Sequence, residues 1–256
     1  MNKVFSEKYK DKQPLVEKFI DSFQSTGDIF GNGDRNVIKL FTLGDSKINI
    51  KSFKVPHLVN KIAYRFFRDS KAKRSFDYAE KLLSLGILTP YPIAYFEEKS
   101  SFNLLKSYYV SEHLEYDLTF RELIEDPKYK NNEEILRAFT NFTYQLHERG
   151  ILFKDHSPGN TLIKIKDDGY DFYLVDLNRM EFKPLDFETC ICNFAKLTPI
   201  KSMIIVMANE YAKLIGEDES KVFNKMWSFT EEFQKRYHDK IALKRKIFFW
   251  KAKYKS

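Results

Sequence analysis

The spacing of apolar residues predicts strands and two helices in the first part of the chain. Residues 1–25 and 58–85 carry apolar side chains near helical period, which predicts one amphipathic helix in each segment. Short β-rich stretches lie around these helices. We expect strands at residues 37–41, 48–53, 93–96 and 108–110. Gly44 and Asp45 lie between the first two stretches and predict a hairpin turn.

The pattern changes after residue 112, where helical spacing dominates. Three helices are expected, at about 132–149, 200–215 and 218–250, with one β-hairpin at 161–175. A β-rich part followed by a helical part predicts an α+β fold of two lobes. We place the N-terminal helix and the β-rich lobe in residues 1–111. The helical lobe, with a basic C-terminal helix or tail, takes residues 112–256.

The composition is that of a globular protein. Of the 256 residues, 43% are hydrophobic and 31% are charged, and the presence of only two cysteines excludes a disulfide scaffold. No apolar run approaches the roughly 20 residues that a membrane-spanning helix needs. The first residues lack the apolar core of a signal peptide, so we expect a cytoplasmic protein.

The formal net charge of +7 is concentrated in two segments. Residues 51–81 contain nine Lys or Arg against three acids, and residues 235–256 contain nine against one. Such segments favour an anionic partner, although a solvated charged face is an equal alternative. The run at 247–250 contains three aromatic residues and lies among basic residues, which favours an anionic membrane surface over packing against the helical lobe. No nucleic-acid motif accompanies the charge, so we expect no nucleic-acid partner.

An Asp and an Asn five residues apart, Asp155 and Asn160, directly precede the predicted hairpin. Asp176 ends its second strand, and the midpoint of residues 160 and 176 falls in the turn at 166–169. The hairpin is therefore expected to bring Asn160 and Asp176 to the same open end, one loop after Asp155. Two carboxylates and one amide oxygen suit Mg²⁺ shared with the phosphates of a nucleotide.

This arrangement resembles the catalytic loop and metal-binding Asp of the protein-kinase-like superfamily. The resemblance implies an ATP-dependent enzyme in which Asp155 is the catalytic base and Asn160 and Asp176 hold Mg²⁺. It also implies a kinase-like fold, with a β-rich N-lobe that contains one main helix and a mainly helical C-lobe.

The N-terminal half resembles the same superfamily independently. Residues 31–38 are similar to the kinase glycine-rich loop, and Lys51 matches the strand lysine that neutralises nucleotide phosphates. The acid that pairs with Lys51 is either Asp77 or Glu80, with Glu80 slightly favoured. The backbone of residues 111–114 would bind adenine. The residues assigned to ATP binding are Gly31, Gly33, Lys51, Glu80, Glu112 and Leu114.

Departures from the protein-kinase pattern narrow the class. Ser157 stands where protein Ser/Thr kinases usually carry Lys, and no Ala-Pro-Glu segment closes a peptide-docking loop. Segments 70–76, 85–95 and 175–179 are similar to the bacterial lipopolysaccharide core kinase family (Kdo/WaaP type), over roughly residues 27–195. That resemblance implies phosphorylation of Kdo or heptose in a lipid A-core precursor, at the cytoplasmic face of the inner membrane.

Three side chains beside these motifs are candidate substrate contacts, namely Lys154, His156 and Arg179. His156 could equally pack inside its loop, and Arg179 could equally brace the loop instead of gripping a carboxylate or phosphate. We expect His147 to be a structural hydrogen-bonding residue. The alternatives are a protein kinase, a soluble small-molecule kinase of the same superfamily, or a non-catalytic ATP-binding membrane adaptor.

Overall fold

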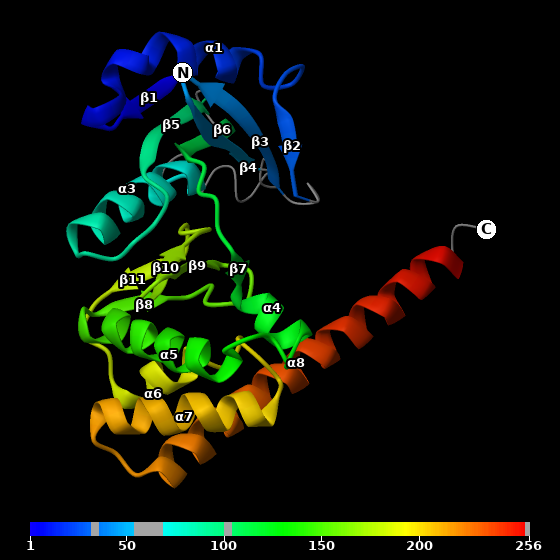
Figure 1. The fold of residues 1–256 in the computed structure, drawn as a ribbon. Coiled ribbons are helices and arrows are strands. Elements are labelled where there is room, and N and C mark those ends of the chain that lie inside the picture. The colour runs from blue at the N-terminus through cyan, green and yellow to red at the C-terminus, as the bar shows by residue number, and fades with distance from the viewer. Residues whose placement is uncertain (32–35, 54–68, 100–103, 254–256) are drawn as a thin grey trace. The chain divides into compact units, whose positions relative to one another are not determined.

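The chain forms two compact units (Figure 1). The computed structural model describes residues 1–31, 36–53, 69–99 and 104–253. Unit 1 comprises Met1–Tyr116 and Tyr173–Met180, and unit 2 comprises Asp117–Phe172 and Glu181–Ser256. The short segment Tyr173–Met180 thus belongs to unit 1, although the chain on both sides of it belongs to unit 2. The domain boundary predicted from the sequence placed this segment in the helical lobe, residues 112–256.

Unit 1 is built on a six-stranded antiparallel sheet with the strand order β1-β5-β6-β4-β3-β2. Its strands are β1 (Asn2–Phe5), β2 (Asp28–Phe30), β3 (Asn36–Leu43), β4 (Ser46–Phe53), β5 (Pro92–Lys99) and β6 (Leu104–Glu112). Its helices are the 3₁₀ helix η1 (Glu7–Lys12), α1 (Gln13–Asp21) and α3 (Lys71–Ser84). All four predicted strands lie in this sheet, and Gly44 takes the left-handed backbone that the tight β3–β4 turn requires (φ 64°).

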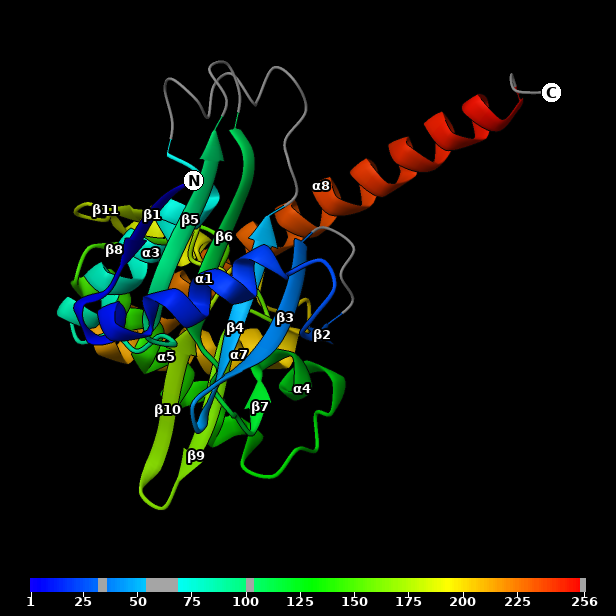
Figure 2. The same cartoon turned by 90° about the horizontal axis from the view of Figure 1, so that it is seen from above.

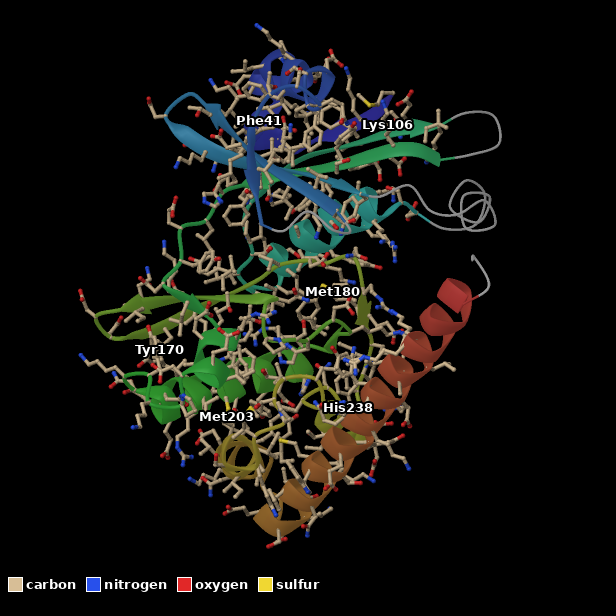
Figure 3. The ribbon with its side chains drawn as sticks, turned by 90° about the vertical axis from the view of Figure 1, so that its right-hand side faces the viewer. Phe41, Lys106, Tyr170, Met180, Met203 and His238 are labelled. Atoms are coloured by element: carbon tan, nitrogen blue, oxygen red, sulfur yellow. The ribbon has the colours of Figure 1, made fainter. Side chains whose placement is uncertain are left out.

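Helices cover both faces of this sheet. Helix α1 lies across one face (Figure 2), where Phe41 of β3 points toward it and stacks on Phe19 (Figure 3), with ring centroids 4.9 Å apart. This face forms a core from Val16, Ile20, Phe23, Phe41, Ile48, Ile50 and Val110. On the other face Phe53 packs with Phe76 of α3. Because strand residues alternate between faces, Lys51 shares the face of Phe53.

The first 25 residues do not form the single helix that their apolar spacing predicted. Only α1 is α-helical, and Pro14 accounts for its start because proline lacks a backbone N–H and fits the first turn. Phe5 lies in β1, which pairs with β5, and its ring meets Phe96 edge-on with centroids 5.5 Å apart. The strand at residues 2–5 depends on an edge that lies some 90 residues later, which local periodicity does not reveal.

The second predicted helix, 58–85, is observed as α3. Ser70 caps its N-terminus by accepting a hydrogen bond from the backbone N–H of Lys73 at 3.1 Å. The part of the prediction that falls on residues 58–68 lies outside the described residues.

Unit 2 is mainly helical, as the pattern after residue 112 predicted. Its helices are α4 (Phe120–Glu125), α5 (Asn132–Glu148), α6 (Phe187–Cys192), α7 (Lys201–Ile215) and α8 (Glu219–Lys253). The strands of this part of the chain are β7 (Leu118–Thr119), β8 (Ile151–Phe153), β9 (Thr161–Lys166), β10 (Gly169–Leu174) and β11 (Met180–Phe182). They form the sheets β10-β9-β7 and β11-β8. The predicted hairpin at 161–175 is β9 and β10.

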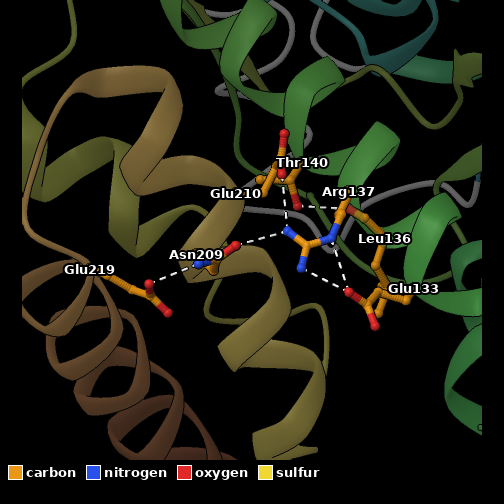
Figure 4. A network of polar contacts seen from close by, with 7 residues as sticks. All are labelled: Glu133, Leu136, Arg137, Thr140, Asn209, Glu210 and Glu219. Carbon is orange, nitrogen blue, oxygen red and sulfur yellow. Dashed lines mark hydrogen bonds and ion pairs between the residues drawn. The ribbon is translucent and has the colours of Figure 1, made fainter.

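A polar network joins the helices of unit 2 (Figure 4). Arg137 of α5 donates hydrogen bonds to Glu133 in its own helix and to Asn209 and Glu210 of α7, at 2.8 to 3.1 Å. Asn209 in turn donates to Glu219 of α8 at 2.8 Å. The guanidinium and its neighbours therefore connect α5, α7 and α8 through side-chain hydrogen bonds.

Helix α8 is buried only at its start. Val222 and Met226 are fully buried, whereas the side chains of residues 231–245 are exposed or half-buried. No helix in the described part of the chain is both long enough and apolar enough to cross a membrane. The structure describes the backbone of residues 247–250 but not their side chains, so their membrane contact stays a prediction.

Candidate active site

An ion pair between Lys51 and Asp176 is the centre of the site in unit 1. Nζ of Lys51 lies 2.7 Å from Oδ1 of Asp176, and the two side chains are 15% and 34% exposed. The contact spans 125 residues of sequence. The segment that carries Asp176 joins unit 1 through Leu174, whose N–H donates to Leu88 and whose carbonyl accepts from the Thr89 hydroxyl. The structure therefore brings together two of the predicted site residues.

Asp176 is held in an unusual backbone conformation. Its φ is 59°, in the left-handed region that residues other than glycine and asparagine rarely occupy. Asn178 supports it by donating from Nδ2 to Asp176 Oδ1 at 2.6 Å, so this oxygen accepts from both Asn178 and Lys51. Oδ2 takes part in neither bond. One oxygen of this carboxylate is therefore fixed by two protein donors.

The two helix acids proposed to pair with Lys51 lie in other surroundings. Asp77 accepts from Lys73 at 2.9 Å, within α3. Glu80 is exposed, and partial desolvation together with the negative charge of Asp77 raises its pKa. In the described structure Lys51 pairs with Asp176, and the assignment of Glu80 to nucleotide binding stays a prediction.

In unit 2 the loop after β8 carries Asp155 and Asn160. Asn160 Nδ2 donates to the backbone carbonyl of Asp155 at 2.8 Å, which closes the loop and leaves the amide oxygen out of that bond. A Cβ at Gly159 would lie 3.2 Å from Nη2 of Arg121, so this guanidinium lies directly against the loop. Arg121 thus brings a positive charge beside this loop, whereas Ser157, which stands where protein Ser/Thr kinases usually carry Lys, is neutral. Arg121 was not identified from the sequence.

His156 lies inside the core of unit 2. Its side chain has no exposed surface, and its ring stacks on Phe139 with centroids 5.3 Å apart and planes 6° apart. The Thr143 hydroxyl lies 3.2 Å from Nε2. Burial lowers the pKa of His156 to about 3, with smaller contributions from His147 and Lys196, so the ring is neutral near pH 7. This location favours the packing alternative over contact with substrate.

His147 supports the same loop through a relay of hydrogen bonds. Its Nε2 donates to Oδ1 of Asn193 at 3.2 Å, and Asn193 Nδ2 donates to the carbonyl of Phe153 at 2.9 Å. Nδ1 is then the acceptor for the Tyr211 hydroxyl, 2.8 Å away. Burial lowers the pKa of His147 to about 4. The predicted structural role of His147 is confirmed, whereas Asn193 had no signal in the sequence.

Lys154 and Arg179 lie at the surface. Lys154 pairs with Glu181, which also pairs with Lys183 at 2.8 Å, and both lysines hold the pKa of Glu181 down at about 2. The carbonyl of Lys154 accepts from Lys196. Arg179 is exposed. Their roles as substrate contacts stay predictions.

The other predicted nucleotide residues are spread over unit 1. Gly31 follows β2 and has a φ of 78°, whereas Gly33 lies outside the described residues. Glu112 ends β6, and its backbone N–H donates to the carbonyl of Tyr91 at 2.9 Å. Leu114 lies two residues beyond this strand and is half-buried. The carboxylate of Glu112 accepts hydrogen bonds from the N-terminal segment, which the sequence did not predict.

The chain is similar in sequence to kinases of lipopolysaccharide. The family model described as "Lipopolysaccharide kinase (Kdo/WaaP) family" matches residues 36–197. A 3-deoxy-D-manno-octulosonic acid kinase of Pasteurella multocida (strain Pm70) is 24% identical over 123 residues. The alignment covers 47% of this chain and 50% of that protein, so the chain matches about half the length of this curated relative.

A solved structure extends the likeness to the whole fold. The structure of WaaP in complex with acyl carrier protein superposes with a TM-score of 0.63 at 14% identity, covering 91% of this chain and 99% of that chain. The predicted kinase-like two-lobe fold is therefore confirmed.

Proposed function

Because this chain belongs to the lipopolysaccharide kinase (Kdo/WaaP) family, we propose that it transfers the γ-phosphoryl group of ATP to a sugar hydroxyl of the lipopolysaccharide inner core. The acceptor sugar is Kdo or heptose, and the likeness to a 3-deoxy-D-manno-octulosonic acid kinase supports Kdo. The Lys51–Asp176 ion pair is the observation that carries the proposal, because it joins the residues expected to contact nucleotide phosphates and their metal.

The donor set suits Mg²⁺. Oδ2 of Asp176 and Oδ1 of Asn160 are hard oxygen donors that take no part in the bonds holding these side chains in place. We assign them to the metal, which when bound neutralises charge on the phosphates. Lys51 would contact the phosphates, and Asp155 would orient the acceptor hydroxyl and take its proton. Catalysis of this kind is mostly positioning and charge neutralisation.

The nucleotide would lie against unit 1. Gly31 and Gly33 would follow its phosphates with their backbone, and the backbone of Glu112 and Leu114 would bind the adenine. The glycine at 31 has the positive φ that lets a main chain turn closely around a ligand.

We also propose contact with an anionic membrane surface through the C-terminal half of α8. Among the described side chains of residues 235–245, five are Lys or Arg and one is Asp, and all lie on an exposed stretch of helix. Each basic residue near an anionic bilayer contributes about 1 kcal/mol. A chain ending at residue 243 should sediment less with anionic vesicles than the full chain does, while its affinity for ATP is unchanged.

The acceptor is tested with the purified protein, ATP, Mg²⁺ and dephosphorylated core glycolipid. Mass spectrometry should find one added phosphoryl group on a Kdo or heptose residue. Parallel reactions with soluble sugars and aminoglycosides, and with protein extract, separate the other kinase classes. ATP binding without consumption on any acceptor would contradict the proposal and support a non-catalytic adaptor. The core glycolipid of cells lacking the gene should lose the same phosphoryl group.

A further inference from the structure

The 3₁₀ helix η1 contacts the end of β6 through the carboxylate of Glu112. Nζ of Lys8 lies 2.7 Å from Glu112 Oε1, and the Tyr9 hydroxyl donates to the same oxygen at 2.6 Å. These residues come 104 and 103 positions earlier in the chain. Two donors that converge on one oxygen fix the orientation of the Glu112 side chain.

Tyr91 completes this contact. The Lys8 ammonium lies 4.6 Å from the centroid of the Tyr91 ring and 5.2 Å from that of Tyr9. The carbonyl of Tyr91 accepts from the backbone N–H of Glu112 at 2.9 Å. Glu112 is thus held through both its main chain and its side chain. The burial of Tyr9 and its hydrogen bond to the negatively charged Glu112 both raise the pKa of Tyr9, which keeps its hydroxyl protonated as a donor.

The helix that provides Lys8 and Tyr9 is itself fixed to the sheet. On one side β1 pairs with β5 over four residues, and the Ser6 N–H donates to the Ile93 carbonyl at 2.9 Å. On the other side α1 buries Val16 and Ile20 in the core of unit 1. The contact with Glu112 therefore connects a rigid support to the end of β6, where the chain leaves the sheet.

We propose that Lys8 and Tyr9 are positioning residues for ATP, which act by holding Glu112 and the backbone that follows β6. This inference rests on the proposed function, in which the main chain at Glu112 and Leu114 binds the adenine. The family model begins at residue 36, so Lys8 and Tyr9 lie outside the residues that it matches.

The proposed role predicts a particular kinetic effect. If the contact with Glu112 is lost, the end of β6 gains freedom that ATP must remove on binding, and affinity falls. The chemistry itself is unaffected, because neither Lys8 nor Tyr9 touches a reacting group. The expected result is a higher KM for ATP, with kcat and the KM for the acceptor unchanged.

The test uses the full chain with Lys8→Met, Tyr9→Phe and the two combined. We expect the double variant to raise the ATP dissociation constant and the KM for ATP roughly 3- to 10-fold, which corresponds to about 1 kcal/mol. The matched control is Lys10→Met, because Lys10 lies in the same helix but pairs with the exposed Glu7. Thermal unfolding of each variant without nucleotide checks that unit 1 is intact.

A double-mutant cycle makes the test specific to Glu112. Glu112→Gln retains an acceptor for Tyr9 but removes the charge, so it should raise the ATP dissociation constant about as much as Lys8→Met does. Adding Lys8→Met to that variant should have little further effect. An unchanged ATP affinity in the Lys8/Tyr9 double variant, or an equal loss in Lys10→Met, would overturn the positioning role alone. Failure of the unaltered protein to bind ATP would overturn the proposed function together with it.

Discussion

The loop at residues 154–160 in unit 2 and the strand end at 176–178 in unit 1 are held in different ways. His156 of the loop is enclosed by aromatic side chains, and the Asn193 amide holds the carbonyl of Phe153 just before it. The strand end is held by an ion pair and an amide on the half-exposed carboxylate of Asp176. Buried packing together with buried hydrogen bonds supports the first segment, and polar contacts to a half-exposed carboxylate support the second.

Because the two segments are held differently, we expect substitutions in one to affect stability and substitutions in the other to affect activity. A partly exposed ion pair such as Lys51–Asp176 contributes about 1 kcal/mol to the free energy of unfolding. A buried ring such as that of His156 has no replacement for its packing, and removing it leaves a cavity. We therefore expect substitutions at the strand end to lower turnover and substitutions beneath the loop to lower the free energy of unfolding.

The largest effect is expected at the strand end. Asp176→Asn should lower kcat about 10³-fold, because a neutral amide is a poorer ligand for Mg²⁺ and leaves phosphate charge uncompensated. The free energy of unfolding should change by less than about 1 kcal/mol, since Asn tolerates the left-handed backbone and its oxygen still accepts hydrogen bonds. Steady-state kinetics and urea unfolding measure the two quantities on the same preparation.

Asp168→Asn is the matched control for this substitution. Asp168 is an exposed carboxylate in the turn between β9 and β10, and neutralising it should leave both turnover and stability unchanged. Near-normal phosphoryl transfer by Asp176→Asn would remove Asp176 from the metal site. A loss of turnover that merely follows a loss of folded protein would erase the distinction between the two segments.

The second expected effect lies beneath the loop. His156→Ala should lower the free energy of unfolding by about 2–3 kcal/mol, because it removes a fully buried ring stacked on Phe139. The affinity of the folded protein for ATP should not change, since the His156 ring contacts Phe139 and Thr143, neither of which is assigned to the nucleotide or its metal. Urea unfolding and equilibrium ATP binding give the two values.

His238→Ala is the control for His156→Ala, because His238 is exposed on α8 (Figure 3). It should change the free energy of unfolding by less than about 0.5 kcal/mol. If His156→Ala were as mild as this control while acceptor binding was lost, His156 would be a substrate contact and the packing interpretation would be wrong.

The hairpin of residues 161–175 and the three long helices α5, α7 and α8 were predicted from local pattern, because turn residues and helical period involve positions close together in the sequence. The short helices α4 and α6 were not predicted. The same logic failed for residues 1–25, where Phe5 enters a strand only because the edge of β5 is available. Family motifs identified Lys51 and Asp176, but their direct contact depends on a short segment joining unit 1. Asn193 and Tyr9 were missed for the same reason, since their partners are distant in sequence.

The smallest expected effect is a dependence of stability on pH that belongs to the buried segment. Burial lowers the pKa of His147 to about 4 and that of His156 to about 3, from an ordinary value of 6.5. Below about pH 6.5 the two histidines bind protons in the unfolded chain but stay neutral in the folded chain, so the free energy of unfolding falls as the pH falls. Each histidine should contribute about 1 kcal/mol per pH unit between pH 6.5 and pH 5.

Urea unfolding between pH 7.5 and pH 5 measures the slope of the free energy of unfolding against pH. Substitutions show how much of this slope each histidine contributes. His147→Gln removes one titrating ring while its amide can still donate to Asn193, so the slope should decrease by about 1 kcal/mol per pH unit. His238→Ala should retain the full slope, because it leaves both buried histidine rings in place. Equal slopes in the unaltered protein and His147→Gln would mean that His147 binds its proton as readily in the folded chain as in the unfolded one. The contrast between the buried support of the loop at 154–160 and the half-exposed support of the strand end at 176–178 would then not hold.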